Sequence, residues 1–263
     1  MVRGTIEMLK RILDNSQYTV ALLGAELKNE AGFLGIKSSE KAYELEKKYK
    51  TSPDYMFSSV YYNTRTDQFF DFYKEEIIAQ DLKPSPTCYA LAAMEKAGKL
   101  QCCINSDVFE LPQRAGCKRA INLRGTVYQN RCPHCGREYS IAYIRQAKGV
   151  PLCEKCKAVI RPQVYLFGEM LDSRLMTETT EEIGKADVLL LIGTNMVSDT
   201  FQHYIVLPCR VRVYQLTGQG NDPNSDHKWI VFPDVPSAPA SFPSRDGHIS
   251  AGWCLHWHGP RFR

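Results

Sequence analysis

The sequence has no apolar run as long as the roughly 18 residues that a membrane-spanning helix needs, so we expect no transmembrane segment. It also has little excess charge: the formal net charge is +4 over 263 residues. Such a small, evenly spread excess gives no reason to expect a nucleic-acid partner. An apolar secretory signal is not expected either, because charged side chains interrupt the amino terminus: Arg3, Glu7, Lys10, Arg11 and Asp14. We therefore expect a soluble, cytoplasmic protein with no membrane partner.

Cysteine is abundant by contrast, and four of the ten cysteines form two CxxC pairs. Cys132 pairs with Cys135 and Cys153 with Cys156, with seventeen residues between the pairs. Four thiolates can surround one ion in a tetrahedron, which suits structural zinc and leaves no open coordination position. The alternatives are two disulfides or two redox pairs, which a reducing compartment disfavours. The spacing predicts a structural zinc site.

Two short apolar runs each end in a turn of small residues. Tyr18 to Leu23 leads into Gly24-Ala25, and Val188 to Ile192 leads into Gly193-Thr194-Asn195. A strand, a small-residue turn and a helix are typical of a doubly wound, Rossmann-like α/β sheet, in which ligands lie beyond the carboxyl ends of the strands. Either turn alone is weak evidence for a ligand, because glycine often serves only the geometry of such a turn.

The remaining patterns predict further elements and a tail. We expect helices over 39–50, 67–80, 88–96 and 177–185, and strands over 100–104 and 211–215. From about residue 233 the periodicity ends. Residues 233–263 are rich in proline and serine, and we expect them to be disordered.

Several motifs occur in the order found in one known family, and together they make the chain resemble a sirtuin, an NAD-dependent protein lysine deacylase. The motifs are Gly24-Ala25, Leu111 with Gln113-Arg114-Ala115-Gly116, the two CxxC pairs, Arg161-Pro162 leading to Phe167-Gly168-Glu169, and Gly193-Thr194. The resemblance extends from Tyr18 to about Thr217, about three quarters of the chain.

The resemblance implies an organisation into two parts within residues 1–232. The large Rossmann-like part would take about 1–30, 76–127 and 165–232. The small part would combine a helical module at about 31–75 with a zinc ribbon at about 128–164. NAD and an acyl-lysine peptide or protein partner would meet between the two parts.

The resemblance also implies roles for individual residues. Positions matching the NAD-binding turns are Gly24, Ala25, Asp107, Gly193, Thr194 and Asn195. The segment with Tyr165, Phe167 and Gly168 matches the part of sirtuins that pairs with the substrate peptide as an added β-strand.

The chain departs from the family where sirtuins carry out their chemistry. The catalytic histidine of the family lies in a Leu-His-Gly segment, which here reads Leu123-Arg124-Gly125. A neutral imidazole accepts a proton near pH 7, whereas a guanidinium with a pKa above about 12 does not. Arg124 can hold a phosphate or a carboxylate instead.

The NAD pocket departs from the family as well. The Gln-Asn-x-Asp motif falls on Ser106-Asp107-Val108-Phe109. Glu26 and Lys28 replace a glycine and a serine of the first turn, Gly35-Ile36-Lys37 replaces an Asp-Phe-Arg motif, and Gln215 replaces an asparagine.

Two hypotheses about function follow. In the first, deacylase chemistry is lost or severely weakened, which leaves a module that binds a peptide, a nucleotide or a partner. In the second, the chain is an active NAD-dependent deacylase or ADP-ribosyltransferase with a rearranged pocket, in which Arg124 binds substrate.

Overall fold

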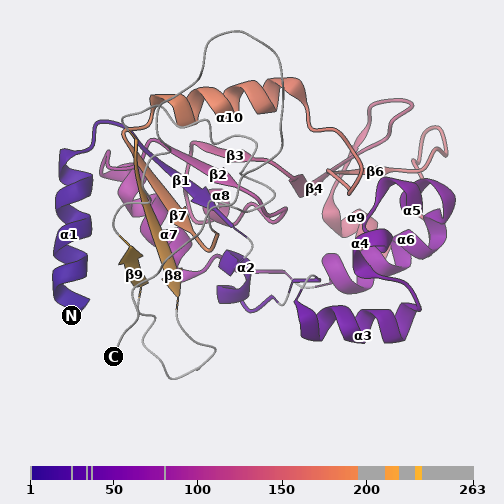
Figure 1. Cartoon of the computed structure of the whole chain (residues 1–263). Coiled ribbons are helices and arrows are strands. Elements are labelled where there is room, and N and C mark those ends of the chain that lie inside the picture. Colours follow the sequence, from indigo (N-terminus) through magenta and orange to yellow (C-terminus); the bar gives the residue numbers. More distant parts are fainter. Residues whose placement is uncertain are drawn as a thin grey trace, which may run out of the picture.

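A computed structural model of the chain describes residues 2–24, 26–33, 35–36, 38–79, 81–194, 211–218 and 229–232 (Figure 1). Its centre is a six-stranded sheet with the order β3-β2-β1-β7-β8-β9. The strands are β1 (Thr19–Leu23), β2 (Cys102–Asn105), β3 (Ala120–Asn122), β7 (Val188–Ile192), β8 (Arg212–Gly218) and β9 (Trp229–Phe232). All neighbours pair in parallel except β8 and β9. The predicted Rossmann-like sheet is confirmed, and its topological switch lies between β1 and β7.

The central strands are buried on both faces because their residues alternate between two cores. Val20 and Leu22 of β1 share a cluster with Ile183 of α10 (Ser173–Lys185). Ala21 and Leu23 belong to the other cluster, which includes Leu91 of α7 (Pro86–Lys96). Figure 1 shows α10 on one side of the sheet and α7 on the other. This two-sided burial explains why β1 and β7 read as continuous apolar runs.

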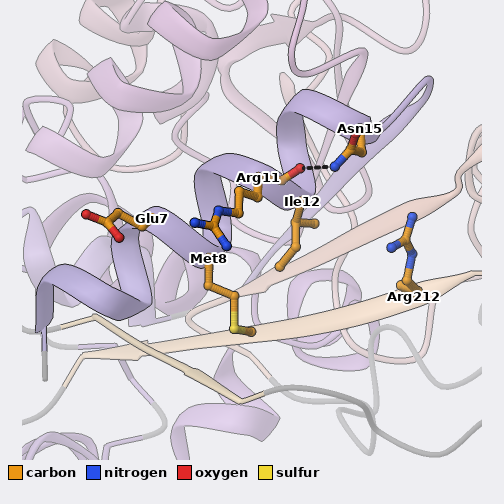
Figure 2. A pocket seen from close by; sticks show the side chains of 6 residues that line it. All are labelled: Glu7, Met8, Arg11, Ile12, Asn15 and Arg212. Carbon is orange, nitrogen blue, oxygen red and sulfur yellow. Dashed lines mark hydrogen bonds between the residues drawn. The ribbon is translucent and has the colours of Figure 1, made fainter.

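The first helix, α1 (Val2–Asn15), was not predicted from the sequence. Figure 2 shows Met8 and Ile12 turned toward the strands beneath the helix. With Arg212, which opens β8, they line a small hollow of about 220 Å³. Because α1 ends before β1 and Arg212 begins β8, this hollow lies at the amino edge of the sheet, opposite the edge where such folds bind ligands.

The region predicted to form the small part combines short helices with a second sheet. Its helices are α3 (Ser39–Tyr49), α4 (Pro53–Met56), α5 (Ser59–Thr64), α6 (Thr66–Phe72), the π-helical turn η1 (Tyr73–Ile77) and α9 (Ile141–Gln146). Its three-stranded sheet has the order β5 (Glu138–Tyr139), β4 (Gly125–Arg131), β6 (Arg161–Val164). Ser38, Ser52 and Ser58 each accept a hydrogen bond from the third following backbone amide, so a serine cap begins each of the helices α3, α4 and α5.

The boundaries differ from expectation in a few places. The helix expected over 67–80 changes to a π-helical turn at Tyr73, and α10 begins at Ser173 because Asp172 caps it. Strand β4 starts at Gly125, upstream of the expected ribbon boundary at 128. The division into a large and a small part stays a prediction. Ala25, Asn195 and the tail at 233–263 lie outside the described residues.

The described helices include none that is long and apolar enough to cross a membrane. Two short helices complete the described elements: α2 (Glu26–Glu30) and α8 (Leu111–Arg114).

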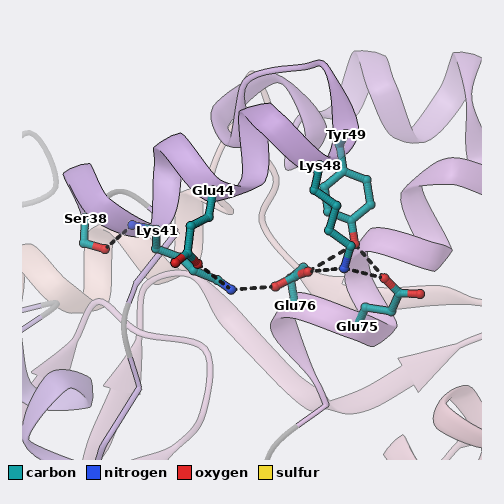
Figure 3. Close-up of polar contacts among 7 residues, drawn as sticks. All are labelled: Ser38, Lys41, Glu44, Lys48, Tyr49, Glu75 and Glu76. Atoms are coloured by element: carbon teal, nitrogen blue, oxygen red, sulfur yellow. Dashed lines mark hydrogen bonds and ion pairs between the residues drawn. The ribbon is translucent and has the colours of Figure 1, made fainter.

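An ion-pair network joins α3 to η1 (Figure 3). Lys48 Nζ lies 2.8 Å from Glu76 Oε1, and Lys41 Nζ lies 3.1 Å from Glu76 Oε2. The Glu76 side chain is 9% exposed, whereas that of Glu75 is 57% exposed. Burial alone would raise the pKa of Glu76, but the hydrogen bonds from Lys48 and Lys41 outweigh it, so the pKa lies below the usual value.

We therefore expect Glu76→Gln to lower the free energy of unfolding by about 1 kcal/mol at pH 7. A carboxyl whose pKa is lowered by folding stabilises above its unfolded pKa, and this contribution is lost as the pH falls through the folded value. The difference between the two proteins should therefore shrink below about pH 4. Urea titrations at both pH values measure it. Glu75→Gln is the control, since its exposed carboxylate should contribute less than about 0.5 kcal/mol; equal losses in both variants would contradict the argument.

Candidate functional site

The two predicted glycine turns meet at the carboxyl edge of the sheet. Gly24 N donates to Ile192 O at 2.9 Å, which ties the end of β1 to the end of β7. A Cβ atom at Gly24 would lie 2.1 Å from Gly193 O and 2.4 Å from Thr194 Cβ. Only glycine permits this close approach of two backbones. The two turns therefore pack closely against each other at the topological switch, where the sequence predicts a ligand.

Asp107 lies at the same edge, two residues beyond β2. Its Oδ1 accepts a hydrogen bond from Phe109 N at 2.6 Å, and the side chain is 3% exposed. Its Oδ2 is buried and has no hydrogen-bond partner among the described residues. Burial raises the pKa of Asp107, although the Phe109 amide, Asn105 and Lys28 oppose the change. A buried acceptor without a partner is the kind of group that a bound donor would satisfy.

Asn105 positions Asp107 and was not predicted from the sequence as a site residue. The residue is fully buried at the end of β2; its Oδ1 accepts from Asp107 N at 3.3 Å and its Nδ2 donates to Asn122 Oδ1 at 3.1 Å. Ser106 fastens the same turn to β1 by donating its backbone N–H and its hydroxyl to Leu23 O. The available signal was an amide side chain at the end of an apolar strand, on the edge where ligands bind.

Phe109 lies in the segment predicted to bind the cofactor, and it belongs to the core. The ring is 3% exposed and lies 5.2 Å from the ring of Phe33 between centroids. The ammonium group of Lys28 lies 5.9 Å from the Phe33 ring centroid. An apolar ring cannot accept a hydrogen bond from a carboxamide as a carboxylate can, so Asp107 is the carboxylate that remains in this segment.

Arg124 contacts Phe167. Its guanidinium carbon lies 5.4 Å from the centroid of the Phe167 ring, a cation–π arrangement, and the arginine is half-buried. Arg124 O accepts a hydrogen bond from Tyr165 N at 3.0 Å. The structure thus brings Arg124 together with the segment predicted to bind a peptide.

The predicted peptide-binding segment already uses most of its backbone groups. Tyr165 N donates to Arg124 O, Leu166 N to Glu169 Oε2, and Phe167 N to Phe57 O, while Phe167 O accepts from Ser59 N. An added strand needs open groups of this kind. The bonds of Tyr165 and Phe167 hold the segment to the rest of the chain, and Gly168 is exposed. Peptide binding by Tyr165, Phe167 and Gly168 stays a prediction.

A hollow of about 780 Å³ runs beside this segment, between β4, β6 and the start of α10. Gly125, Tyr165 and Glu169 are among its lining residues. Glu169 is held by Arg161, whose Nη2 lies 2.6 Å from Glu169 Oε1. The hollow is large enough for an extended peptide segment and is lined by both charged and apolar groups.

The four cysteine sulfurs converge beside the second sheet, in the segments that follow β4 and precede β6. All lie within 4.8 Å of one another; Cys132 Sγ is 3.4 Å from Cys156 Sγ, and Cys135 Sγ is 3.5 Å from Cys153 Sγ. These separations exceed a disulfide bond of about 2.05 Å. They are close to about 3.8 Å, the distance between two sulfurs that bind the same tetrahedral zinc.

The two CxxC knuckles have the same backbone geometry. Cys132 O accepts from Gly136 N at 3.0 Å, and Cys153 O accepts from Lys157 N at 2.9 Å. Gly136 and Lys157 both have a positive φ, of 73° and 60°. This repeated turn points each pair of sulfurs inward, as a four-thiolate site requires.

The thiols cannot all ionise side by side without a cation. A hydrogen bond from the Tyr139 hydroxyl lowers the pKa of Cys153 to about 5. The Ala158 amide lowers the pKa of Cys156, but hydrogen bonds to Cys132 and the other thiols outweigh it and raise the pKa to about 12. A divalent ion removes this conflict by stabilising every thiolate, so the donor set fits zinc.

Comparison with known proteins agrees with this geometry. A family model described as "Sir2 family" matches residues 24–199. The NAD-dependent protein deacetylase of Clostridium acetobutylicum is 32% identical over 193 residues, which cover 73% of this chain and 79% of the relative. That of Clostridium perfringens is 33% identical over 192 residues, with 73% and 79% covered.

Solved structures agree as well. One described as "The Structural basis of Sirtuin Substrate Affinity" has a TM-score of 0.71 at 25% identity, covering 80% of this chain and 86% of the other. A Sir2 homologue solved as an NAD complex has a TM-score of 0.68 at 25% identity, with 80% and 81% covered. The chain belongs to the Sir2 family, the sirtuins, whose curated members matched here are NAD-dependent protein deacetylases.

Proposed function

We propose that this chain is a sirtuin domain that binds a nucleotide and a peptide or protein partner, and in which deacylase chemistry is lost or severely weakened. The observation that carries the proposal is Arg124. It stands at the position of the catalytic histidine and lies against the Phe167 ring. A guanidinium stays protonated at neutral pH and has no acceptor nitrogen, so it cannot take a proton from a ribose hydroxyl.

The residues present fit NAD in part. Gly24 and Gly193 lie in close contact at the carboxyl edge of the sheet, where such folds bind ligands, and the unpaired Oδ2 of Asp107 can accept a hydrogen bond from a carboxamide. We propose that Gly24, Asp107, Gly193 and Thr194 contact the cofactor, with Ala25 and Asn195. When bound, NAD supplies the ADP-ribosyl group to which sirtuins transfer the acyl group. Phe109 offers no polar contact to it, so we expect the affinity to be weakened.

The four cysteines hold a structural zinc in this proposal. A closed four-thiolate site has no position for a substrate, so the zinc supports the small sheet and takes no part in catalysis. The hollow beside Tyr165 and Glu169 is the proposed place for part of a peptide partner.

The first test is calorimetric titration of the zinc-loaded protein with NAD and, separately, with ADP-ribose. Arg124→His should restore a residue of the right pKa for the base but leave Asp107 and Phe109 unchanged. We therefore expect deacylation of an acetyl-lysine peptide, measured as nicotinamide release, to stay within about tenfold of the unmodified chain.

A recovery of about a hundredfold or more in Arg124→His would contradict the proposal that the NAD pocket is impaired as well. Arg11→Gln on α1 is the matched control, since it removes an exposed arginine far from the carboxyl edge. NAD turnover by the unmodified chain at the rate of an ordinary deacylase would refute the loss of catalysis.

A second function is favoured by one observation. Asp107 is a buried carboxyl whose pKa is raised, the kind of group that can accept a proton in catalysis. The chain would then be an active deacylase or ADP-ribosyltransferase with a rearranged pocket. Nicotinamide release by the unmodified chain that disappears in Asp107→Asn would support this function over the first.

A further inference from the structure

We propose that the zinc ribbon carries a docking surface for an acidic segment of a partner protein. The surface lies around the two CxxC knuckles, apart from the turns proposed to hold a nucleotide. The inference goes beyond the proposed function, because docking at this surface requires neither NAD nor a catalytic base.

The excess positive charge of the chain is concentrated in the zinc ribbon and is not evenly spread, as was expected from the sequence. Of the 33 lysines and arginines, seven lie within residues 128–164, and of the 29 aspartates and glutamates, only two do. The rest of the chain is left with 26 basic and 27 acidic residues. A zinc ion held by four thiolates has a net charge of about −2, so the ribbon keeps a positive excess when the metal is bound. An acidic partner would therefore be attracted to the ribbon more than to the rest of the chain.

The fold gathers three of these cations around the two knuckles. Cys132 Sγ lies 3.4 Å from Cys156 Sγ. Arg131 precedes Cys132, and Lys155 and Lys157 flank Cys156, so the three side chains start from backbone segments that lie close together. All three residues are exposed. Within the described part of the chain, the ammonium groups of both lysines have no hydrogen bond or ion pair, so their charge is available to a partner.

Arg131 is held in position before any partner binds. Its Nε donates a hydrogen bond to Gly136 O at 3.2 Å. A Cβ at Gly136 would lie 3.1 Å from Arg131 Nη2, so the glycine leaves room for the guanidinium beside the first knuckle. The two terminal nitrogens of Arg131 have no hydrogen bond or ion pair to the residues that the structure describes. A planar guanidinium held in this way can bind both oxygens of a carboxylate with little loss of freedom.

A hollow of about 520 Å³ opens between the first knuckle and β6. Arg131, His134 and Gln163 are among the residues that line it, and all three are exposed. Arg161 lines it as well, but this arginine is already paired with Glu169. The hollow is large enough for a few side chains of a peptide, with the guanidinium of Arg131 at its wall.

An acidic protein segment fits this surface better than a nucleic acid does. Nucleic acids are usually bound by a continuous row of cations that meets successive phosphates. Here a few cations surround one hollow, which suits a few carboxylates. The hollow also shares Arg161 and Gln163 with the larger hollow proposed for a peptide partner, so one partner can occupy both. This last argument rests on the proposed function.

The test uses the zinc-loaded full chain and two fluorescent decapeptides with blocked ends. One peptide alternates glutamate with serine, and the other has glutamine in place of every glutamate. By fluorescence anisotropy at low salt, we expect the glutamate peptide to bind with a Kd below ~1 mM and at least about fivefold more tightly than the glutamine peptide. Binding should weaken as the salt concentration rises to about 0.5 M, because salt screens exposed charges.

The double variant Arg131→Gln with Lys155→Gln should weaken binding of the glutamate peptide by about fivefold or more. Lys10→Gln with Arg11→Gln is the matched control, since it removes one exposed lysine and one exposed arginine from α1. Figure 1 shows α1 and the ribbon strands β4 and β6 at opposite ends of the molecule, so this control should stay within about twofold. Elemental analysis checks that each variant keeps its zinc. If the double variant loses zinc, Lys155→Gln alone replaces it, with an expected loss of about twofold.

Three results would overturn the inference: no binding of the glutamate peptide up to millimolar concentration, equal binding of the two peptides, or an equal loss in the control. A single-stranded thymidine hexanucleotide has as many charges as the glutamate peptide. If it binds more tightly than that peptide and loses affinity in the same ribbon variant, the surface takes nucleic acid and the inference fails. The proposed nucleotide binding and loss of catalysis are judged separately, by calorimetry with ADP-ribose and by NAD turnover.

Discussion

Cys132→Ser is expected to remove the proposed zinc and unfold the small sheet. Cys132 and Cys153 are fully buried, and their sulfurs lie with those of Cys135 and Cys156 in one cluster. Three remaining thiols bind zinc far more weakly, and zinc binding by such sites is coupled to folding. We expect the free energy of unfolding to fall by more than about 3 kcal/mol. The zinc content, by elemental analysis, should fall from about one ion per chain to well below half.

Cys117→Ser is the matched control, because Cys117 is also buried but lies outside the cluster. This variant can lose some stability, yet it should keep its zinc. Full zinc occupancy in Cys132→Ser, or less than about half an ion per chain in the unmodified protein, would refute the four-thiolate site.

Gly24→Ala is expected to have the second large effect. The new Cβ would lie 2.1 Å from Gly193 O, and neither backbone can move away easily, because β1 and β7 are paired over their whole length in the middle of the sheet. Overpacking of this kind costs about 3 kcal/mol when the neighbours are backbone atoms. Thermal unfolding should show a fall in Tm of roughly 6–12 °C for a chain of this size. Whatever affinity for ADP-ribose the unmodified chain has should be lost as well.

Gly184→Ala on α10 is the control for Gly24→Ala. A Cβ at Gly184 meets no atom within 4 Å, and the residue lies inside a helix. Alanine should therefore stabilise the chain by up to about 1 kcal/mol. A Tm for Gly24→Ala equal to that of the unmodified chain would show that the two turns are less closely packed than the structure has them.

Local patterns in the sequence were sufficient to predict the sheet and the cysteine cluster. The apolar runs of β1 and β7 predict buried parallel strands because a strand covered on both faces has no polar side to reveal an alternation. The CxxC spacing predicts a four-sulfur cluster because each knuckle is a short turn whose geometry is local. The absence of histidine at position 124 is likewise a fact of the sequence alone.

Other features depend on segments that are distant in the sequence. The need for glycine at position 24 comes from Gly193, 169 residues later, and the unpaired oxygen of Asp107 is evident only once burial is known. The hydrogen bonds from Tyr165 to Arg124 and from Phe167 to Phe57 likewise join segments that are far apart in the sequence. The sequence by itself determined which chemical groups the chain has and which groups of the family's chemistry it lacks. Only the tertiary structure decided which of them meet and which backbone groups remain available, because burial and pairing are made by contacts across the fold.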